Sequence, residues 1–416
     1  MDDTRSPDPP PPFFSALTRR ESSALAATFA GWMLDGMDVM AYSFVLPTLI
    51  VLWHLTKGEA GLLGTSALIV SALGGWLAGL AADRFGRVKV LQLTILWFAF
   101  FTFLSGFANS FPQLLITRAL QGFGFGGEWA VGSVLIGETI RSEHRGKAVG
   151  IVQSGWAIGW GIAAVFYTVL FLTIPTAYAW RAMFWIGLLP ALLIFYIRRH
   201  VHEPEIFNRK LSEKPPGKLL DIFSPTAIRT TLLASLVAVG AQGGYHAITT
   251  WLPLYLSTTR GLSVFATGTY LCVIIAGSFA GYLISAWLTD KLGRKQTLIA
   301  FAAGSFIMVC LYMVLPLSNT AMLVLGFPLG FFPSGSFSPV GAFFTELFPT
   351  HMRASGQGFS YNAGRAIAAL FPALVGYLST RAGLGAAIAT FAGVAYLIMI
   401  AAVLSLPETR GRELEN

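Results

Sequence analysis

Charged residues are scarce in this sequence. They make up 12% of the 416 residues, against roughly 25% in ordinary soluble domains, while hydrophobic residues make up 55%. So few charges cannot cover the surface of a soluble protein of this length, which excludes a soluble enzyme and a disordered chain. Cysteine is scarcer still: Cys272 and Cys310 both lie in apolar segments, so we exclude a disulfide scaffold and expect two small buried apolar side chains. The remaining class is a protein that crosses a membrane many times.

Apolar segments long enough to span a membrane recur along the whole chain. At about 20 residues for each helix, they predict twelve transmembrane helices. Six fall within 24–198 and six within 230–405, separated by a basic, polar loop at 199–229. Short tails remain at 1–23 and 406–416. We therefore expect an all-α integral membrane protein made of two six-helix bundles.

The distribution of basic residues predicts the orientation. The net charge is +8, and about 22 of the 28 Lys and Arg residues fall in the tails, the central loop and the connections on the same side. By the positive-inside rule, this side is cytoplasmic, so both termini are expected in the cytoplasm and the chain in the cell inner membrane. The basic residues form no single patch, so we expect a lipid bilayer around a monomer and no nucleic-acid partner.

An internal repeat relates the two sets of helices. The sequence D-R-F-G-R at 83–87 recurs as D-K-L-G-R at 290–294, an offset of 207 residues. Glu138 recurs as Glu346, an offset of 208 residues. Two independent motifs at nearly the same offset indicate duplicated halves, a plan in which the substrate binds near the midplane between them.

The repeated motifs predict a charged latch on the cytoplasmic side. The glycines allow tight turns, and each aspartate can meet the N-terminus of a helix from the other half, where the dipole favours negative charge. Arg145 and Arg353 are expected to pair with Glu138 and Glu346, and the alternative is a simple topology anchor. The latch residues are Asp83, Arg84, Gly86, Arg87, Glu138, Arg145, Asp290, Gly293, Arg294, Glu346 and Arg353.

Three stretches of the sequence resemble signatures of the major facilitator superfamily: 79–87, 118–126 and the tail P-E-T-R-G at 407–411. More narrowly, W-M-L-D-G-M-D, G-F-G-G-E-W-A and V-Q-S-G-W-A-I-G-W-G are similar to the sialate:proton symporter family. Their ranges are 32–38, 124–130 and 152–161. That family includes bacterial sialic-acid transporters and fungal lactate permeases. The resemblance implies transport of a carboxylate with protons.

One departure from that family lies in the seventh expected helix. The lactate permeases carry an H-x-[S/T]-Q-D core there, whereas this chain has A-Q-G-G-Y-H-A-I-T-T at 241–250. This argues against lactate itself. The D-G-M-D stretch also resembles the first helix of aromatic-acid symporters.

Charged residues at membrane depth are expected to be functional. Asp35 and Asp38 lie about 17–21 Å into the first helix, three residues apart on one face. A carboxylic acid at that depth can take up a proton on one side and release it on the other. Arg118 and Glu128 lie in the fourth helix, where the resemblance implies that the arginine takes part in proton transfer. Glu128 is expected to be either a second protonatable group or a substrate ligand, and the alternative for all four residues is a static buried network.

A second group of polar residues predicts the substrate site. Arg365, about 18 Å into the eleventh helix, offers a bidentate guanidinium to a carboxylate, with Asn362 on the same face. Gly243-Gly244 is expected to break the seventh helix, and the fifth helix carries an amide and two indoles at helical spacing. The alternative is ordinary packing. The further candidates for substrate binding are Gln153, Trp156, Trp160, Gln242, Tyr245 and His246.

These observations favour a proton-coupled symporter that imports a small organic acid anion, not an enzyme. We expect no cofactor and no metal site, with the proton gradient as the energy source. Sialic-acid and aromatic-acid symport are the alternatives within this class. A drug:proton antiporter is a further alternative, although residues 147–173 lack the Gly-Pro that such exporters carry in the fifth helix.

Overall fold

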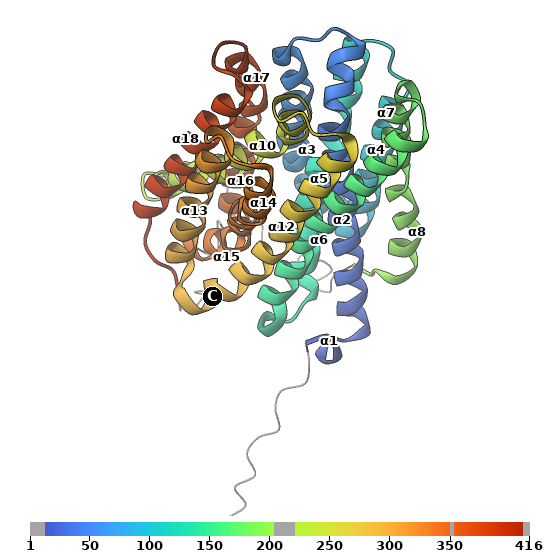
Figure 1. Ribbon diagram of the computed structural model, residues 1–416. Helices are drawn as coiled ribbons and strands as arrows, with labels where there is room; N and C mark the ends of the chain where they lie inside the picture. The colour runs from blue at the N-terminus through green and yellow to red at the C-terminus, as the bar shows by residue number, and fades with distance from the viewer. Residues whose placement is uncertain (1–12, 204–220, 350–352, 411–416) are drawn as a thin grey trace, which may run out of the picture.

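The computed structural model describes residues 13–203, 221–349 and 353–410, without the side chains of 83, 142–146, 221, 290, 345 and 353–355. The described secondary structure is entirely helical, and long helices run side by side through the molecule (Figure 1). This confirms the predicted all-α fold class.

The first half of the chain, blue to green in Figure 1, begins with a short helix and five long ones. Its last segment consists of two helices joined by a 3-10 turn. The elements are α1 (Phe13–Ala16), α2 (Arg19–Leu52), α3 (Lys57–Phe85), α4 (Arg87–Ser105), α5 (Phe111–Thr139), α6 (Ser142–Thr173), α7 (Thr176–Trp185), η1 (Ile186–Leu188) and α8 (Pro190–His200).

The second half, yellow to red in Figure 1, repeats this order with more interruptions. Three of its segments are broken into shorter helices near proline residues. The elements are η2 (Asp221–Phe223), α10 (Ile228–Thr249), α11 (Leu252–Leu254), the π-helix η3 (Tyr255–Thr259), α12 (Val264–Leu292), α13 (Arg294–Val314), α14 (Asn319–Gly335), α15 (Phe337–Leu347), α16 (Arg353–Ala368), α17 (Phe371–Ala382) and α18 (Leu384–Leu404).

Ten helices of the described chain are long and apolar enough, by length and composition, to cross a membrane. Neither α5 nor α10 is among them. α5 carries Arg118 and Glu128, and α10 carries Gln242 and His246, all of them buried. A polar side chain at membrane depth must face the protein interior, so these two helices are expected to supply functional groups alongside Asp35 and Asp38 of α2 and Arg365 of α16.

Each half contains a pair of helices whose backbones pack closely at a glycine. A Cβ added at Gly126 of α5 would lie 1.7 Å from the Ser71 carbonyl oxygen of α3. A Cβ added at Gly330 of α14 would lie 1.8 Å from the Ile274 carbonyl oxygen of α12. Only glycine permits this approach, so the two helix pairs form corresponding rigid units in the two halves.

Two helix pairs join one half to the other. α6 and α12 run side by side at the boundary, where a Cβ at Gly268 would lie 2.6 Å from Thr168 Oγ1 (Figure 1). The beginning of α3 packs closely on the beginning of α17, where a Cβ at Gly61 would lie 2.6 Å from the Pro372 carbonyl oxygen. The ends of α3 and α17 therefore lie in direct contact.

The expected helix break at Gly243-Gly244 is wrong. α10 continues through both residues to Thr249, and the irregular segment begins afterwards, around Pro253. Gly244 instead makes room for a neighbouring helix, since a Cβ there would lie 2.4 Å from the Tyr396 ring of α18. The two glycines therefore serve helix packing.

The expected burial of both cysteines is also wrong. Cys272 on α12 is exposed and Cys310 on α13 is partly buried. In a membrane protein the outer surface faces apolar lipid, so an apolar segment has a large exposed face of apolar side chains.

Candidate functional site

A cavity lies between the two halves, with about 380 Å³ of space not filled by protein atoms. We call it the Arg365 cavity. Its walls are mainly aromatic, and the residues that line it are Trp32, Phe125, Gln153, Trp156, Gln242, Tyr245, His246, Tyr282, Phe337, Tyr361 and Arg365.

Arg365 is the only charged side chain among these lining residues, and it is 3% exposed. Its Nε donates a hydrogen bond to Gln242 Oε1 at 3.2 Å. Its guanidinium carbon lies 5.2 Å from the Phe125 ring centroid and 5.1 Å from that of Tyr361. Arg365 Nη1 has no hydrogen-bond partner within the described chain, so it remains able to bind an anion in the cavity.

Two further contacts orient the walls. Gln242 Nε2 donates to the Tyr361 carbonyl oxygen at 3.1 Å, which fixes the amide so that its oxygen faces Arg365. Trp156 Nε1 donates to the Tyr245 hydroxyl at 2.7 Å, a bond from α6 in the first half to α10 in the second. The cavity is therefore assembled from both halves.

Asp35 and Glu128 form a buried acidic pair beside this cavity. Asp35 is fully buried, faces Glu128 and Asp38, and has the Arg365 guanidinium as its nearby cationic group. The Asp35 and Glu128 carboxyl groups interact directly with each other, and no other described residue hydrogen-bonds to either Asp35 oxygen. Gly31 makes room for Glu128, because a Cβ there would lie 2.3 Å from Oε1. Two buried carboxyl groups in contact are well suited to share or pass a proton.

Asp38 belongs to a separate contact between α2 and α5. Gln121 Nε2 donates to Asp38 Oδ2 at 2.6 Å, and the guanidinium carbon of Arg118 lies 4.8 Å from the Tyr42 ring centroid. Arg118 interacts electrostatically with both Asp38 and Tyr42. The structure thus places the two aspartates of α2 in different surroundings, one beside Glu128 and one beside Arg118.

The structure brings six of the eight expected substrate-binding residues to the cavity: Gln153, Trp156, Gln242, Tyr245, His246 and Arg365. Asn362 does not line it. Its Nδ2 donates to the Gly358 carbonyl oxygen at 3.0 Å, and its Oδ1 packs on Gly75 of α3. Trp160 is buried outside the lining, with its ring 6.5 Å from that of Tyr245.

Five lining residues were missed by the sequence reasoning: Trp32, Phe125, Tyr282, Phe337 and Tyr361. Spacing offered a signal for two of them, since Trp32 precedes Asp35 by three residues and Tyr361 precedes Arg365 by four. Phe125 lies inside the helix-four glycine motif, which drew attention to the glycines instead. No sequence signal marks Tyr282 or Phe337, which come from α12 and α15.

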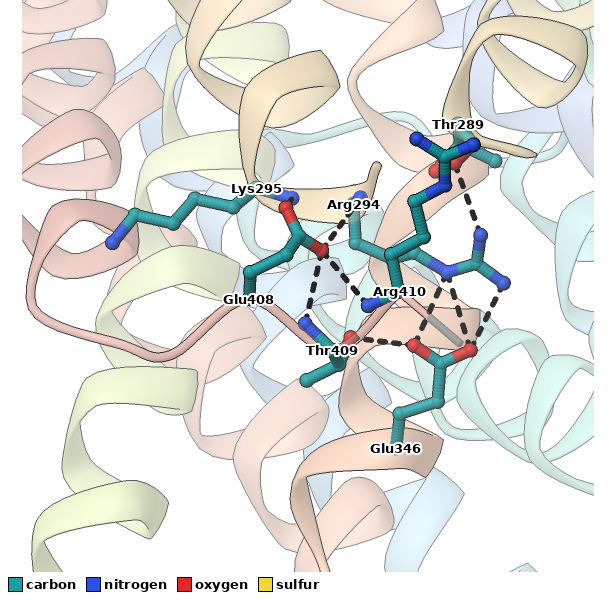
Figure 2. A network of polar contacts seen from close by, with 7 residues as sticks. All are labelled: Thr289, Arg294, Lys295, Glu346, Glu408, Thr409 and Arg410. Carbon is teal, nitrogen blue, oxygen red and sulfur yellow. Dashed lines mark hydrogen bonds and ion pairs between the residues drawn. The ribbon is translucent and has the colours of Figure 1, made fainter. Parts of the chain in front are cut away.

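The repeated charged motifs form matching networks at the α3–α4 and α12–α13 turns. Gly86 and Gly293 both have a φ of 104°, and Arg87 Nε binds Glu138 at 3.1 Å. Arg294 Nη2 binds Glu346 at 2.9 Å, and Figure 2 shows the surrounding contacts. Exposed Arg84 lies over the Phe85 ring. The side chains of Asp83, Arg145, Asp290 and Arg353 lie outside the described residues.

Each network contains a carboxylate that the sequence reasoning missed. Glu203 accepts from the backbone N–H groups of Arg87 and Val88, both at 2.9 Å. Glu408 accepts from those of Arg294 and Lys295 at 3.0 and 3.1 Å (Figure 2). Each carboxylate therefore caps a helix N-terminus within its own half, whereas Asp83 and Asp290 were expected to meet a helix of the other half. Glu203 and Glu408 are 205 residues apart, close to the offset between the two halves, and this spacing was the sequence signal that could have identified them.

Comparison with known proteins agrees with this architecture. The family model of the major facilitator superfamily matches residues 28–322 and 272–416. The chain belongs to this superfamily. A protein named as a probable 4-methylmuconolactone transporter of Cupriavidus pinatubonensis is 44% identical over 97% of the chain and 94% of its own length. The sialic acid transporter NanX of Escherichia coli is 30% identical over 91% and 93%.

Solved structures of the superfamily share the fold. A D-xylose-proton symporter superposes with a TM-score of 0.72 at 19% identity, covering 95% of this chain and 100% of that one. The chain described here, as a member of the superfamily, is a membrane transporter rather than an enzyme.

Proposed function

We propose that the protein imports a small organic acid anion together with one or more protons by alternating access. The observation that carries this proposal is Arg365, a buried guanidinium in an aromatic cavity between the halves, whose Nη1 has no hydrogen-bond partner among the described residues. A planar guanidinium binds a carboxylate in a bidentate manner, and the cavity offers no competing acid among its lining residues.

The aromatic walls favour a flat, unsaturated acid over a saturated one. Trp32 and Trp156 have ring centroids 4.9 Å apart, and Tyr245 and Phe337 are 5.4 Å apart. Aromatic rings stack well on flat conjugated groups. The name of the 44% identical relative supports this choice, since 4-methylmuconolactone is a small unsaturated acid. Sialic acid, named for the second relative, is the alternative substrate.

Proton coupling is assigned to the buried acids of α2 and α5. Asp35 and Glu128 lie next to the Arg365 cavity, so a proton on this pair changes the charge that a bound anion meets. The proton pathway continues through a second group of buried residues, which consists of Asp38, Gln121 and Arg118. The drug:proton antiporter is the competing function, and the direction of the gradient that drives transport separates the two.

The proposed orientation follows the distribution of basic residues, with the chain in the inner membrane and both termini in the cytoplasm. A single chain is sufficient for transport. The networks at the α3–α4 and α12–α13 turns then lie on the cytoplasmic side, where they serve as the latch. Asp83→Asn is expected to impair transport while leaving acid binding largely intact. Equal losses of binding and transport would contradict the latch.

The deciding experiment is uptake into proteoliposomes under an imposed inward proton gradient. The panel of labelled acids contains 4-methylmuconolactone, sialic acid, benzoate, lactate and a dicarboxylate. We expect uptake of an unsaturated acid that collapses with a protonophore and with Arg365→Ala. Arg381→Ala is the matched control, because Arg381 is an exposed arginine in the next helix. Failure of every acid would favour export or a substrate that is not an acid.

A further inference from the structure

A second cavity, with about 380 Å³ of space not filled by protein atoms, lies between α2, α3, α5 and α10, and it is lined by the Arg118 and Gln121 side chains assigned above to proton coupling. We call it the Arg118 cavity. Its polar lining residues include Arg118, Gln121, Ser43 and Thr250. It shares Phe125 and His246 with the Arg365 cavity, so these two side chains separate the two spaces.

Arg118 lies over the Tyr42 ring and interacts electrostatically with Asp38, yet two of its nitrogens have no hydrogen-bond partner among the described residues. It is 2% exposed, and neither its Nε nor its Nη1 has a hydrogen-bond partner within the described chain. The nearby Asp38 carboxylate directs Oδ2 to Gln121 instead. Unsatisfied buried donors are unfavourable, so the arrangement is best explained by a ligand that accepts these hydrogen bonds.

The two arginines lie along one continuous track. Arg118 and Phe125 are seven residues apart on α5, which is nearly two turns, so they occupy one side of the helix about 10 Å apart. Gln242 and His246 on α10 and Thr250 directly after it follow at intervals of four residues and line the two cavities in order. The Phe125 ring also contacts the Arg365 guanidinium, at 5.2 Å.

We infer that the Arg118 cavity is a second binding site for the carboxylate of the transported acid. The acid occupies Arg118 at one stage of its passage and Arg365 at another, and it moves between them past Phe125 and His246. This inference rests on the proposed function for the identity of the ligand. The chemistry that it requires is an anion able to accept from Arg118 Nε and Nη1.

A thiol-protection experiment on the full chain tests this inference. Both native cysteines are replaced by serine, and Ser43→Cys reports on the Arg118 cavity, since Ser43 lines that cavity alone. Gln153→Cys is the matching reporter for the Arg365 cavity. The rate of modification by methyl methanethiosulfonate is measured with and without saturating 4-methylmuconolactone.

We expect the acid to slow modification at both reporters at least fivefold. Protection of the Ser43→Cys thiol should persist with Arg365→Ala and be lost with Arg118→Gln. Protection of the Gln153→Cys thiol should show the opposite dependence, which also demonstrates that the Arg118→Gln chain is folded and binds acid.

Protection of only the Gln153→Cys thiol would overturn the second site and leave the proposed function standing. The same conclusion follows if protection of the Ser43→Cys thiol depends on Arg365 and not on Arg118, because occupancy of a single site would then change both cavities. Protection at neither reporter by any acid of the panel would overturn both proposals.

Discussion

Gln121 and Asp38 are joined by a hydrogen bond of 2.6 Å between two fully buried side chains of α5 and α2. The Gln121 amide is the donor to this carboxylate's Oδ2, and Thr102 is a further hydrogen-bonding neighbour of the same carboxylate. The bond joins α2 to α5 beside the Arg118 guanidinium, which interacts electrostatically with Asp38. Disrupting it should affect both stability and coupling.

Gln121→Leu should therefore destabilise the protein by about 1–3 kcal/mol, because it removes the donor from a buried carboxylate while keeping a similar side-chain volume. Thermal unfolding of the detergent-purified protein measures this loss. Gln113→Leu is the matched control on the same helix, since Gln113 is exposed and accepts only from the Asn109 N–H. Equal effects of the two substitutions would contradict the assigned role.

Gly31→Ala should reduce proton-driven uptake several-fold. The added methyl group overlaps Glu128 Oε1, at 2.3 Å, and overpacking of this kind costs about 1–3 kcal/mol unless the carboxyl group moves away from Asp35. Gly137→Ala on α5 provides the control, because nothing lies within 4 Å of its added Cβ. Unchanged uptake by the Gly31→Ala protein would show that the position of Glu128 is unimportant.

Tyr245→Phe and Trp156→Phe should show a coupling free energy of about 0.5–1.5 kcal/mol in a double-mutant cycle of thermal stability. Each substitution removes one partner of the 2.7 Å hydrogen bond between the two halves. The cycle of Tyr245→Phe with Trp160→Phe serves as the comparison, since those rings are 6.5 Å apart. Zero coupling in the first cycle would refute a contribution of this bond.

Glu203→Ala and Glu408→Ala should each lower stability by about 0.5–2 kcal/mol, the usual range for loss of a helix cap. Each removes the acceptor for two backbone N–H groups, at the start of α4 or of α13. The sites lie in different halves, so the losses should add in the double variant. Arg381→Ala is the surface control. A loss confined to one glutamate would contradict their equivalence.

Much of the architecture could be predicted from the sequence because membrane helices leave a local signal. Each span must be about 20 apolar residues long, and each buried charge within a span is conspicuous. Arg365, Gln242 and His246 were identified for this reason. The same logic failed for Cys272, since hydrophobicity does not distinguish the lipid-facing side of a helix from its core.

The positions of the side chains around the Arg365 cavity could be determined only from the tertiary structure. Asn362 shares a helix face with Arg365, yet the close approach of α3 at Gly75 takes its side chain away from the cavity. Tyr282 and Phe337 reach the cavity from segments far away in sequence. The Gly243-Gly244 pair was expected to free backbone groups, whereas Tyr396 of α18 occupies the space beside Gly244.

The sequence by itself therefore determined the helical membrane fold, the duplicated halves and the short set of buried charges, because these depend on composition and spacing along one chain. The tertiary structure alone decided which charges meet. It placed Asp35 with Glu128 and Asp38 with Gln121, assigned the capping role to Glu203 and Glu408, and divided the interior into two cavities with an arginine in each. Such partnerships depend on the distances between helices, which the helical period along any one segment does not contain.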